Sequence, residues 1–173
     1  QALADRLDRS IERRVCESLA AGASFEEAYL SLDAGLRSIH LSAYQSRIFN
    51  ECLRLGAPRG GPRHPGVAGP YRFFEEDPGD LEGESIPLAS AEAGEHSWLD
   101  AVLTGMGVDR AKLARLPFRA GRRDAVVGPA DLQVAEPEPD DLNDGRTSIT
   151  LAFALRPGSY ATMLVKRCTY DLR

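Results

Sequence analysis

The sequence Ser-Ile-Thr-Leu-Ala-Phe-Ala-Leu at 148–155, followed at once by Arg-Pro-Gly-Ser-Tyr-Ala-Thr-Met-Leu-Val-Lys-Arg at 156–167, decides the fold class. Apolar side chains alternate in the first run, so they share one face of a predicted strand. Pro157-Gly158 ends that strand, and Ser159 stands where a helix N-cap would offer its hydroxyl to free amides. We therefore predict a strand, a sharp turn and a helix. Such a corner presents unpaired amide donors, and Tyr160 is either a site residue or a core ring.

Two short helices are predicted near the N-terminus. One apolar stripe recurs every four residues and ends near Gly22; it consists of Leu3, Leu7, Ile11, Val15 and Leu19. Ser24 and Glu27 then have the spacing of a capping box for a second helix. That second helix is expected to bury Phe25, Ala28, Tyr29 and Leu32.

A third helix, from Leu36 to Leu55, is apolar on two faces when its residues are placed about 100° apart. The first face holds Leu36, Ile39, Ala43 and Leu53, and the second holds Leu41, Tyr44, Ile48, Cys52 and Leu55. We therefore expect a central helix that is packed on two sides. Ser46 and Asn50 fall on the first face, where they either bond a neighbouring loop or line a cleft.

The middle of the chain alternates irregular and helical segments. Residues 57–70 contain four Pro and four Gly and read as a surface loop, and Trp98 is expected in the core. A helix is predicted to begin at Ser97 and to end at Gly105-Met106-Gly107, and Asp109 is predicted to cap a basic helix that runs toward Leu116.

The last third is predicted to contain strands. They lie at 126–127, 132–134 and 149–155, and the acidic, turn-rich connection at 136–145 favours an antiparallel hairpin. With the helices before them, these strands make the chain an α+β protein.

The net charge of −5 hides a strong segregation of charges. Residues 54–72 and 110–123 carry basic side chains and no acids, whereas residues 75–100 hold nine acids and no Lys or Arg. A basic strip of this kind either follows an RNA backbone or is an ordinary solvated surface. The candidate RNA-binding residues are Arg59, Arg63, Arg115, Arg119, Arg122 and Arg123.

Cysteine and histidine usage points away from metal and disulfide chemistry. Cys16, Cys52 and Cys168 are odd in number and form no CxxC pair, so we expect buried thiols in a reducing, cytoplasmic environment. The three histidines are equally scattered, and no metal site is predicted. No apolar run is long enough for a membrane span, and no leader is seen.

Three ordered motifs resemble the TruD family of tRNA pseudouridine synthases. A Ser-Ala-x-x-Ser-x-x-Phe-Asn helix is matched by Ser42, Ala43, Ser46, Phe49 and Asn50. A Gly-x-Arg-Arg element and a following Pro-x-Asp-Leu are matched by Gly121, Arg122, Arg123, Pro129, Asp131 and Leu132. The Pro-x-Gly-Ser-Phe/Tyr-Ala-Thr corner is matched at 157–162, with the proline one place closer to the glycine.

The resemblance implies isomerisation of uridine in tRNA to pseudouridine, with no cofactor and no metal. It implies a helical segment of the catalytic domain at 1–33, an insertion domain at 34–130 and a C-terminal part of the catalytic domain at 131–173. Tyr160 would form a wall of the uracil pocket. The implied substrate-binding set is Gly158, Ser159, Tyr160, Ala161, Thr162, Ser46 and Asn50. The expected partner is tRNA or another structured RNA, and the expected state is a monomer.

One departure from the family concerns the catalytic aspartate, which family members carry in a Gly-x-Lys-Asp segment before the Ser-Ala helix. Neither that segment nor the Asn-x-Phe-Gly element that follows it occurs before Ser42 here. Asp124 lies in the wrong place and is not nominated. We therefore expect the catalytic residue in a missing N-terminal half, with this part inactive alone. The alternative is a non-catalytic RNA-binding or scaffold domain descended from such an enzyme.

Overall fold

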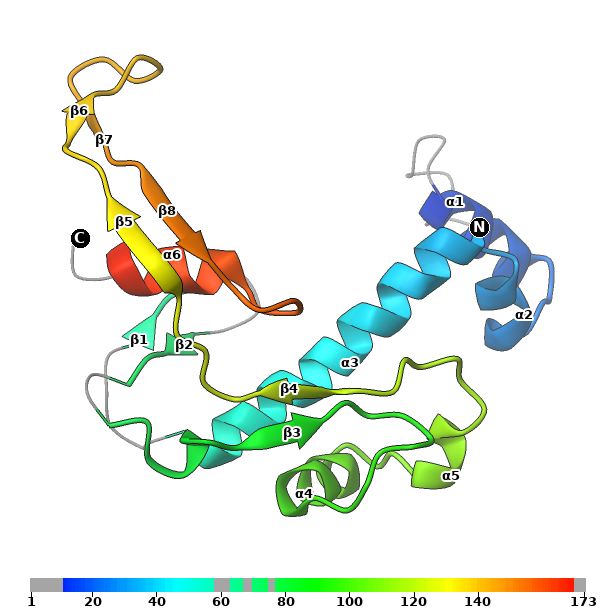
Figure 1. Cartoon of the computed structure of the whole chain (residues 1–173). Coiled ribbons are helices and arrows are strands. Elements are labelled where there is room, and N and C mark those ends of the chain that lie inside the picture. The colour runs from blue at the N-terminus through cyan, green and yellow to red at the C-terminus, as the bar shows by residue number, and fades with distance from the viewer. Residues whose placement is uncertain (1–10, 58–62, 67–69, 75–76, 170–173) are drawn as a thin grey trace.

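The computed structural model describes residues 11–57, 63–66, 70–74 and 77–169 (Figure 1). Helices and short antiparallel strand pairs are mixed along the chain, which confirms the predicted α+β class. The helices are α1 (Ile11–Ala20), α2 (Phe25–Leu30), α3 (Ala34–Gly56), α4 (Ser97–Gly105), α5 (Arg110–Leu113), α6 (Ala161–Thr169) and the 3-10 helix η2 (Gly79–Leu81). The strands are β1 (Arg63–His64), β2 (Tyr71–Arg72), β3 (Ser85–Pro87), β4 (Arg122–Asp124), β5 (Ala130–Val134), β6 (Glu138–Pro139), β7 (Thr147–Ser148) and β8 (Leu151–Ala154).

Local sequence signals predict the end of α1 and the start of α2 correctly, whereas Leu3 and Leu7 of the predicted first helix lie outside the described residues. α1 stops before Gly22, whose φ of +95° suits glycine, and α2 starts with the predicted capping box. The Ser24 hydroxyl accepts from the Glu27 amide at 3.2 Å, and the Glu27 carboxylate accepts from the Ser24 amide at 2.8 Å. The burial prediction for α2 is partly wrong, because Ala28 is buried but Phe25 is 84% exposed.

The long helix α3 starts at the cap Asp33, whose side chain accepts from the Gly35 and Leu36 amides. It buries one face of its second half, and its first half projects away from that core (Figure 1). The predicted packing on two sides is wrong in the described part of the chain, since Ile39 is 64% exposed and Ala43 is also exposed. The reason is that α4 and β3 pack on the side of α3 that holds Ile48 and Cys52, and of the first predicted face Leu53 packs against that core.

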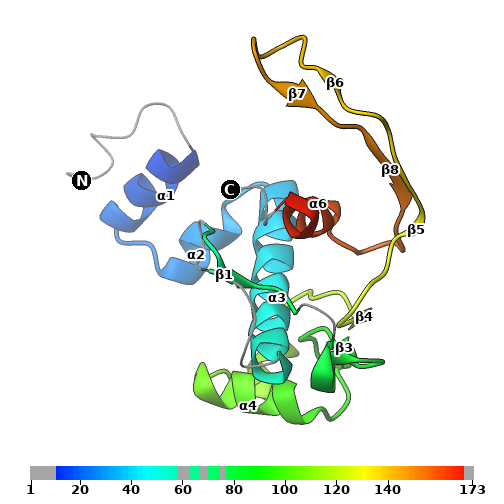
Figure 2. The same ribbon diagram turned by 90° about the vertical axis from the view of Figure 1, so that its left-hand side faces the viewer.

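The core of the described part lies where α4 and β3 pack against the second half of α3 (Figure 2). Ile48, Ile86 and Leu99 are fully buried there. Trp98, which is half-buried, packs on Gly56 so closely that a Cβ added to Gly56 would lie 2.2 Å from the indole ring. The glycine therefore allows the close approach of α4 to the end of α3.

The predicted bounds of α4 and the predicted start of α5 are confirmed, whereas the predicted end of α5 is wrong. α4 runs over Ser97–Gly105 and is followed by Gly107 with a φ of +65°. The Asp109 carboxylate accepts from the Ala111 amide at 2.9 Å, as a cap should. The basic helix that it starts is only one turn long and ends at Leu113 rather than near Leu116.

Strand β4 pairs antiparallel with β3, with Ile86 opposite Arg123. The strand predicted at 126–127 is thus displaced to 122–124, because β3 offers its backbone groups there. The buried Gln45 of α3 joins both ends of the segment between the two strands. Its amide donates to the carbonyls of Ala89 and Arg119, each at 2.9 Å.

The predicted hairpin is confirmed: β5 pairs antiparallel with β8, and the ribbon extends through β6 and β7 (Figures 1 and 2). Leu151 and Phe153 are half-buried while Ala152 and Ala154 are exposed, which confirms the alternation. A bulge interrupts the register between Ala130 and Gln133, and Asp131 within it has a φ of +52°. Every residue of β5 is exposed.

The glycine- and proline-rich segment at 57–70 is described only in part. Arg63 and His64 pair with Tyr71 and Arg72 as the short strands β1 and β2, a pairing that the loop prediction did not include. Arg59 lies outside the described residues. Among the described helices, none is both long enough and apolar enough to cross a membrane.

Candidate functional site

Two of the sequence motifs meet on one side of α3. The Tyr160 hydroxyl donates to the Ser46 hydroxyl oxygen at 3.0 Å, although 114 residues separate the two in the chain. Ser46 is half-buried on the helix, one turn from the core residue Phe49, and Tyr160 follows the turn that leads into α6. The structure therefore brings together two residues that were predicted to bind substrate.

Arg123, from the Gly-x-Arg-Arg motif, completes this cluster. Its Nη1 donates to the Tyr160 hydroxyl at 2.6 Å and to the Ser46 hydroxyl at 3.3 Å. Its guanidinium carbon lies 5.4 Å from the Tyr160 ring centroid and 5.6 Å from that of Phe49, within cation–π range of both. Ser46, Phe49, Arg123 and Tyr160 are called the corner cluster below.

The alternation of side chains along β4 places Arg123 in the corner cluster. Neighbouring residues of a strand point to opposite faces, so Arg123 turns toward α3 while Arg122 stays exposed and donates to the Ser85 carbonyl. Asp124 accepts from Arg156 at 3.1 Å, which ties the start of the corner to the same strand. Asp124 thus has a structural partner, and it remains unassigned to catalysis.

The backbone of the corner explains its glycine. Gly158 has a φ of +88°, a conformation that side chains disfavour, and the Ser159 amide donates to the Arg156 carbonyl at 3.1 Å. The predicted N-cap role of Ser159 is wrong, because α6 begins at Ala161. Tyr160 precedes the first helical residue, and its carbonyl accepts from the amides of Met163 and Leu164.

The other predicted substrate-binding residues lie near the corner cluster without joining it. Asn50 is exposed on α3, one helical turn beyond Ser46 on a neighbouring part of the same surface. Ala161 and Thr162 are exposed in the first turn of α6. Phe49 was not among the predicted site residues, and Arg123 was predicted to bind RNA. Both residues belong to motifs that carry the family resemblance, and that shared origin was the sequence signal that could have placed them in the site.

The predicted arginine strip is partly exposed. Arg115, Arg119 and Arg122 are accessible, whereas Arg123 is half-buried in the corner cluster. The backbone of Arg63 lies in β1. RNA binding by the strip therefore remains a prediction, and it concerns the exposed side chains of Arg115, Arg119 and Arg122.

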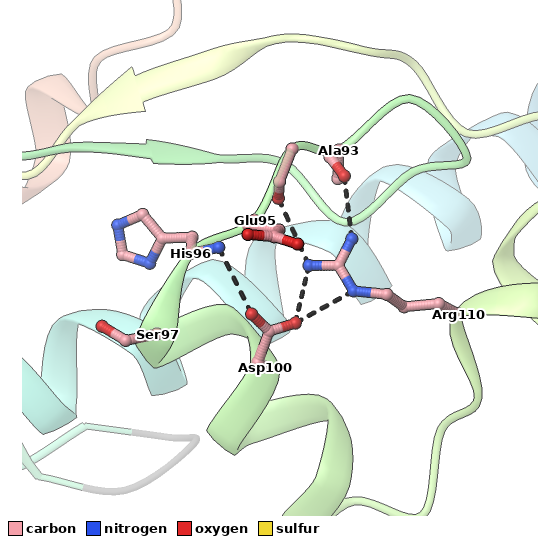
Figure 3. A pocket seen from close by; sticks show the side chains of 7 residues that line it. Ala93, Glu95, His96, Ser97, Asp100 and Arg110 are labelled. Atoms are coloured by element: carbon pink, nitrogen blue, oxygen red, sulfur yellow. Dashed lines mark hydrogen bonds and ion pairs between the residues drawn. The ribbon is translucent and has the colours of Figure 1, made fainter.

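A cavity lies next to α4 (Figure 3), and none of its lining residues belongs to the corner cluster. The Arg110 guanidinium donates twice to the Asp100 carboxylate, at 2.7 and 2.9 Å, and once each to the carbonyls of Ala93 and Gly94. The hydrogen bond from Arg110 lowers the pKa of the Asp100 carboxyl. His96 is turned away from Arg110, and its Nε2 lies 2.7 Å from Glu84. The cavity is lined by Ala93, Gly94, Glu95, His96, Ser97, Asp100 and Arg110. Because the hydrogen bonds of Arg110 join α4 to the segment before it, we assign these residues a structural role.

The cysteines differ in accessibility. Cys52 is buried, and this burial raises the pKa of its thiol to about 11. Cys16 is half-buried, and the prediction of burial is wrong for Cys168, which is exposed on α6. In the described ranges, no three residues among His, Cys, Asp and Glu lie together in a way that would hold a metal ion.

Comparisons with known proteins point to one family. The model of the tRNA pseudouridine synthase D (TruD) family matches residues 2–79. A protein named "Probable tRNA pseudouridine synthase D 2" from Methanocaldococcus jannaschii is 28% identical over 160 residues, which cover 83% of this chain and 38% of the relative. A "Probable tRNA pseudouridine synthase D 1" from Methanococcus maripaludis is 26% identical over 171 residues, or 90% of this chain and 44% of the relative.

The chain thus spans less than half the length of these curated relatives. No solved structure matches it at a significant level. The family match includes the Ser-Ala helix motif, and the matches to the two relatives extend over most of the chain. Together they confirm the resemblance drawn from the motifs: residues 2–79 match the TruD family of tRNA pseudouridine synthases, and most of the chain is similar to proteins named tRNA pseudouridine synthase D.

Proposed function

We propose that this chain is part of an enzyme that converts uridine in tRNA to pseudouridine, and that the corner cluster forms one wall of the uracil pocket. The observation that carries the proposal is the hydrogen bond between Tyr160 and Ser46. It joins two motifs that sequence alone assigned to the same site. The similarity to tRNA pseudouridine synthases D supports the proposed reaction, and the contact between the two motifs supports its proposed place.

The chemistry requires a base that has left its stack. The C1′–N1 bond of the uridine breaks, the uracil turns, and its C5 is joined to C1′; C5 loses its hydrogen as a proton and N1 gains a proton, so the reaction is an isomerisation. Enzymes that act on an extruded base stack it on aromatic or apolar side chains. Tyr160 is 41% exposed and lies beside backbone amides at the start of α6, so it combines a stacking surface with nearby donors. We assign no catalytic aspartate within this chain.

The cluster also lies where two proposed domains meet. Ser46, Phe49 and Arg123 belong to the proposed insertion domain at 34–130, and Tyr160 belongs to the proposed catalytic part at 131–173. Ligand pockets occur preferentially at domain interfaces. The exposed arginines Arg115 and Arg119 would then contact the phosphates of the RNA that delivers the base.

The uracil wall is tested by Tyr160→Ala in the natural protein that contains this chain, with tRNA as substrate. We expect a loss of about 1 to 3 kcal/mol in productive binding, the usual cost of removing a stacking ring. Tyr160→Phe keeps the ring and should retain most of the activity. Phe25→Ala removes another exposed ring, on α2, and serves as the control. Equal pseudouridine formation by Tyr160→Ala and the unmodified protein would remove Tyr160 from the site.

The RNA surface is tested by charge reversal. Arg115→Glu combined with Arg119→Glu should weaken tRNA binding and flatten its dependence on salt, because fewer counterions are released. Arg146→Glu, on the exposed connection of the hairpin, is the control. An unchanged affinity and salt slope would leave the strip an ordinary solvated surface. Binding of tRNA by the natural protein without any pseudouridine formation would favour the non-catalytic alternative.

A further inference from the structure

We propose that Arg123 is a positioning residue for Tyr160 and not a phosphate contact of the arginine strip. This inference rests on the proposed function, because it assigns Arg123 a role in the same uracil-binding wall. The guanidinium donates to the hydroxyl groups of Ser46 and Tyr160 and lies over the Tyr160 ring. These contacts fix the direction of the ring. The ring then presents its remaining surface to a base.

The hydrogen bonds of the corner cluster form a closed triangle. Arg123 donates to Tyr160 and to Ser46, and Tyr160 donates to Ser46. One terminal nitrogen of a guanidinium has two hydrogens, so Nη1 is able to make both of its bonds at once. A phenol has a single hydrogen, and here it is directed at Ser46. Each donor of the triangle therefore has a defined acceptor, and the phenol oxygen has little freedom to move.

The ring needs this support because its own segment provides little. Tyr160 follows Gly158, whose φ is +88°, and the helix it leads into buries none of its residues in the described structure. Ser46 and Phe49, in contrast, stand on a helix whose neighbours Ile48 and Cys52 are fully buried. Arg123 thus transfers the rigidity of the α3 core to an exposed corner. A misplacement of about 1 Å in a reactive site costs up to about 100-fold in rate.

The surroundings of Arg123 distinguish it from the strip. Arg115, Arg119 and Arg122 are exposed, whereas Arg123 is half-buried, with its guanidinium near two aromatic rings. Arginine suits this place better than lysine because a planar guanidinium stacks on rings and donates in fixed directions. A lysine would keep the positive charge but lose that geometry. A phosphate contact depends mainly on charge, so the two roles predict different effects of Arg123→Lys.

The test uses the natural protein that contains this chain, with Arg123→Lys, Arg123→Met and the control Arg13→Met. Arg13 lies on α1, far in sequence from the corner cluster, and donates a hydrogen bond to Glu17. Two measurements on tRNA are made: the rate of pseudouridine formation in a single turnover at saturating tRNA, and the dissociation constant over a range of salt. A third measurement records the 19F resonance of 3-fluorotyrosine placed at position 160, without RNA.

For both Arg123 variants we expect a fall of about 10- to 100-fold in the single-turnover rate, with tRNA affinity and its salt slope little changed. The 19F resonance should move in both and stay in place in Arg13→Met. If Arg123→Met does not fold, Arg123→Lys decides alone. An unmoved resonance, or a loss confined to tRNA affinity with a flatter salt slope in Arg123→Met, would overturn the positioning role. If the unmodified protein makes no pseudouridine, the proposed function fails, while the resonance still reports whether Arg123 holds the ring.

Discussion

The second half of α3 with β3, β4 and α4 differs sharply from the hairpin of β5 and β8. In the first region Ile48, Ile86 and Leu99 are fully buried, so it has a hydrophobic core of its own. In the hairpin every residue of β5 is exposed, and the strands form a two-stranded ribbon. An isolated ribbon of this kind is marginally stable in water. Packing thus holds the first region together, whereas local geometry and the polar contacts of the corner hold the second.

The largest effect should come from emptying the core. Leu99→Ala is expected to lower the free energy of unfolding by about 2 to 5 kcal/mol, because it leaves a cavity among fully buried neighbours. Ile149→Ala, at a hairpin position that is 52% exposed, should change it by about 0.5 kcal/mol or less. Urea unfolding followed by the fluorescence of Trp98 measures both. Equal losses would show that the hairpin is packed as tightly as the core.

The buried thiol of the first region should make its stability depend on alkaline pH. Burial raises the pKa of Cys52 from 9.0 to about 11. Below pH 9 the thiol is protonated in both states; as the pH rises further, the unfolded chain loses its proton first, so stability is lost between about pH 9 and 11. The expected loss is about 2 to 3 kcal/mol.

The control for this pH effect is Cys52→Ala, which should have a smaller decline over the same range than the unmodified chain. Exposed Cys168 should react readily with a thiol reagent in the folded state, while Cys52 should react only after unfolding. Parallel declines of the two proteins between pH 9 and 11 would contradict the assignment to Cys52.

A smaller effect is expected where α4 approaches the end of α3. Gly56→Ala places a methyl group 2.2 Å from the Trp98 ring, so the helices must shift, at a cost of about 1 to 3 kcal/mol. Gly105→Ala adds the same methyl group in α4 where nothing lies within 4 Å, and it should be neutral or slightly stabilising. Thermal unfolding of the two variants should therefore move in opposite directions or differ clearly.

The smallest effect probes the hairpin. Asp131 has a φ of +52° in the bulge, so Asp131→Gly should stabilise the ribbon by up to about 1 kcal/mol, while Asp131→Val should destabilise it. Hydrogen exchange of the Ala135 amide, which donates to the Thr150 carbonyl at 3.0 Å, reports on this ribbon directly. Slower exchange in the valine variant than in the glycine variant would contradict the prediction.

Local signals predicted local structure well. The capping box of Ser24 and Glu27, the cap at Asp109 and the alternation around Phe153 each depend on residues a few positions apart, and the structure contains all three. The strand pairing of β5 with β8 was also predictable, because one acidic, turn-rich connection separates its two strands.

Predictions that depend on distant partners failed more often. Arg122–Asp124 has little intrinsic preference for a strand, and it forms one because β3 lies beside it. The apolar pattern of α3 shows which residues are suited to burial, but which face is covered depends on where β3 and α4 pack. The corner cluster was half predicted: Ser46 and Tyr160 were named, whereas the pairing through Arg123 requires three segments in space.

The buried amide of Gln45 determines how the segment between β3 and β4 should respond to changes in its length. Because it joins the carbonyls of Ala89 and Arg119, both ends of the intervening segment are anchored to the same point of α3. The entropy of closing a flexible loop grows only with the logarithm of its length. Insertions in the exposed turns around α5 should therefore be tolerated without moving Arg123. A change at Gln45 itself would release both anchors at once.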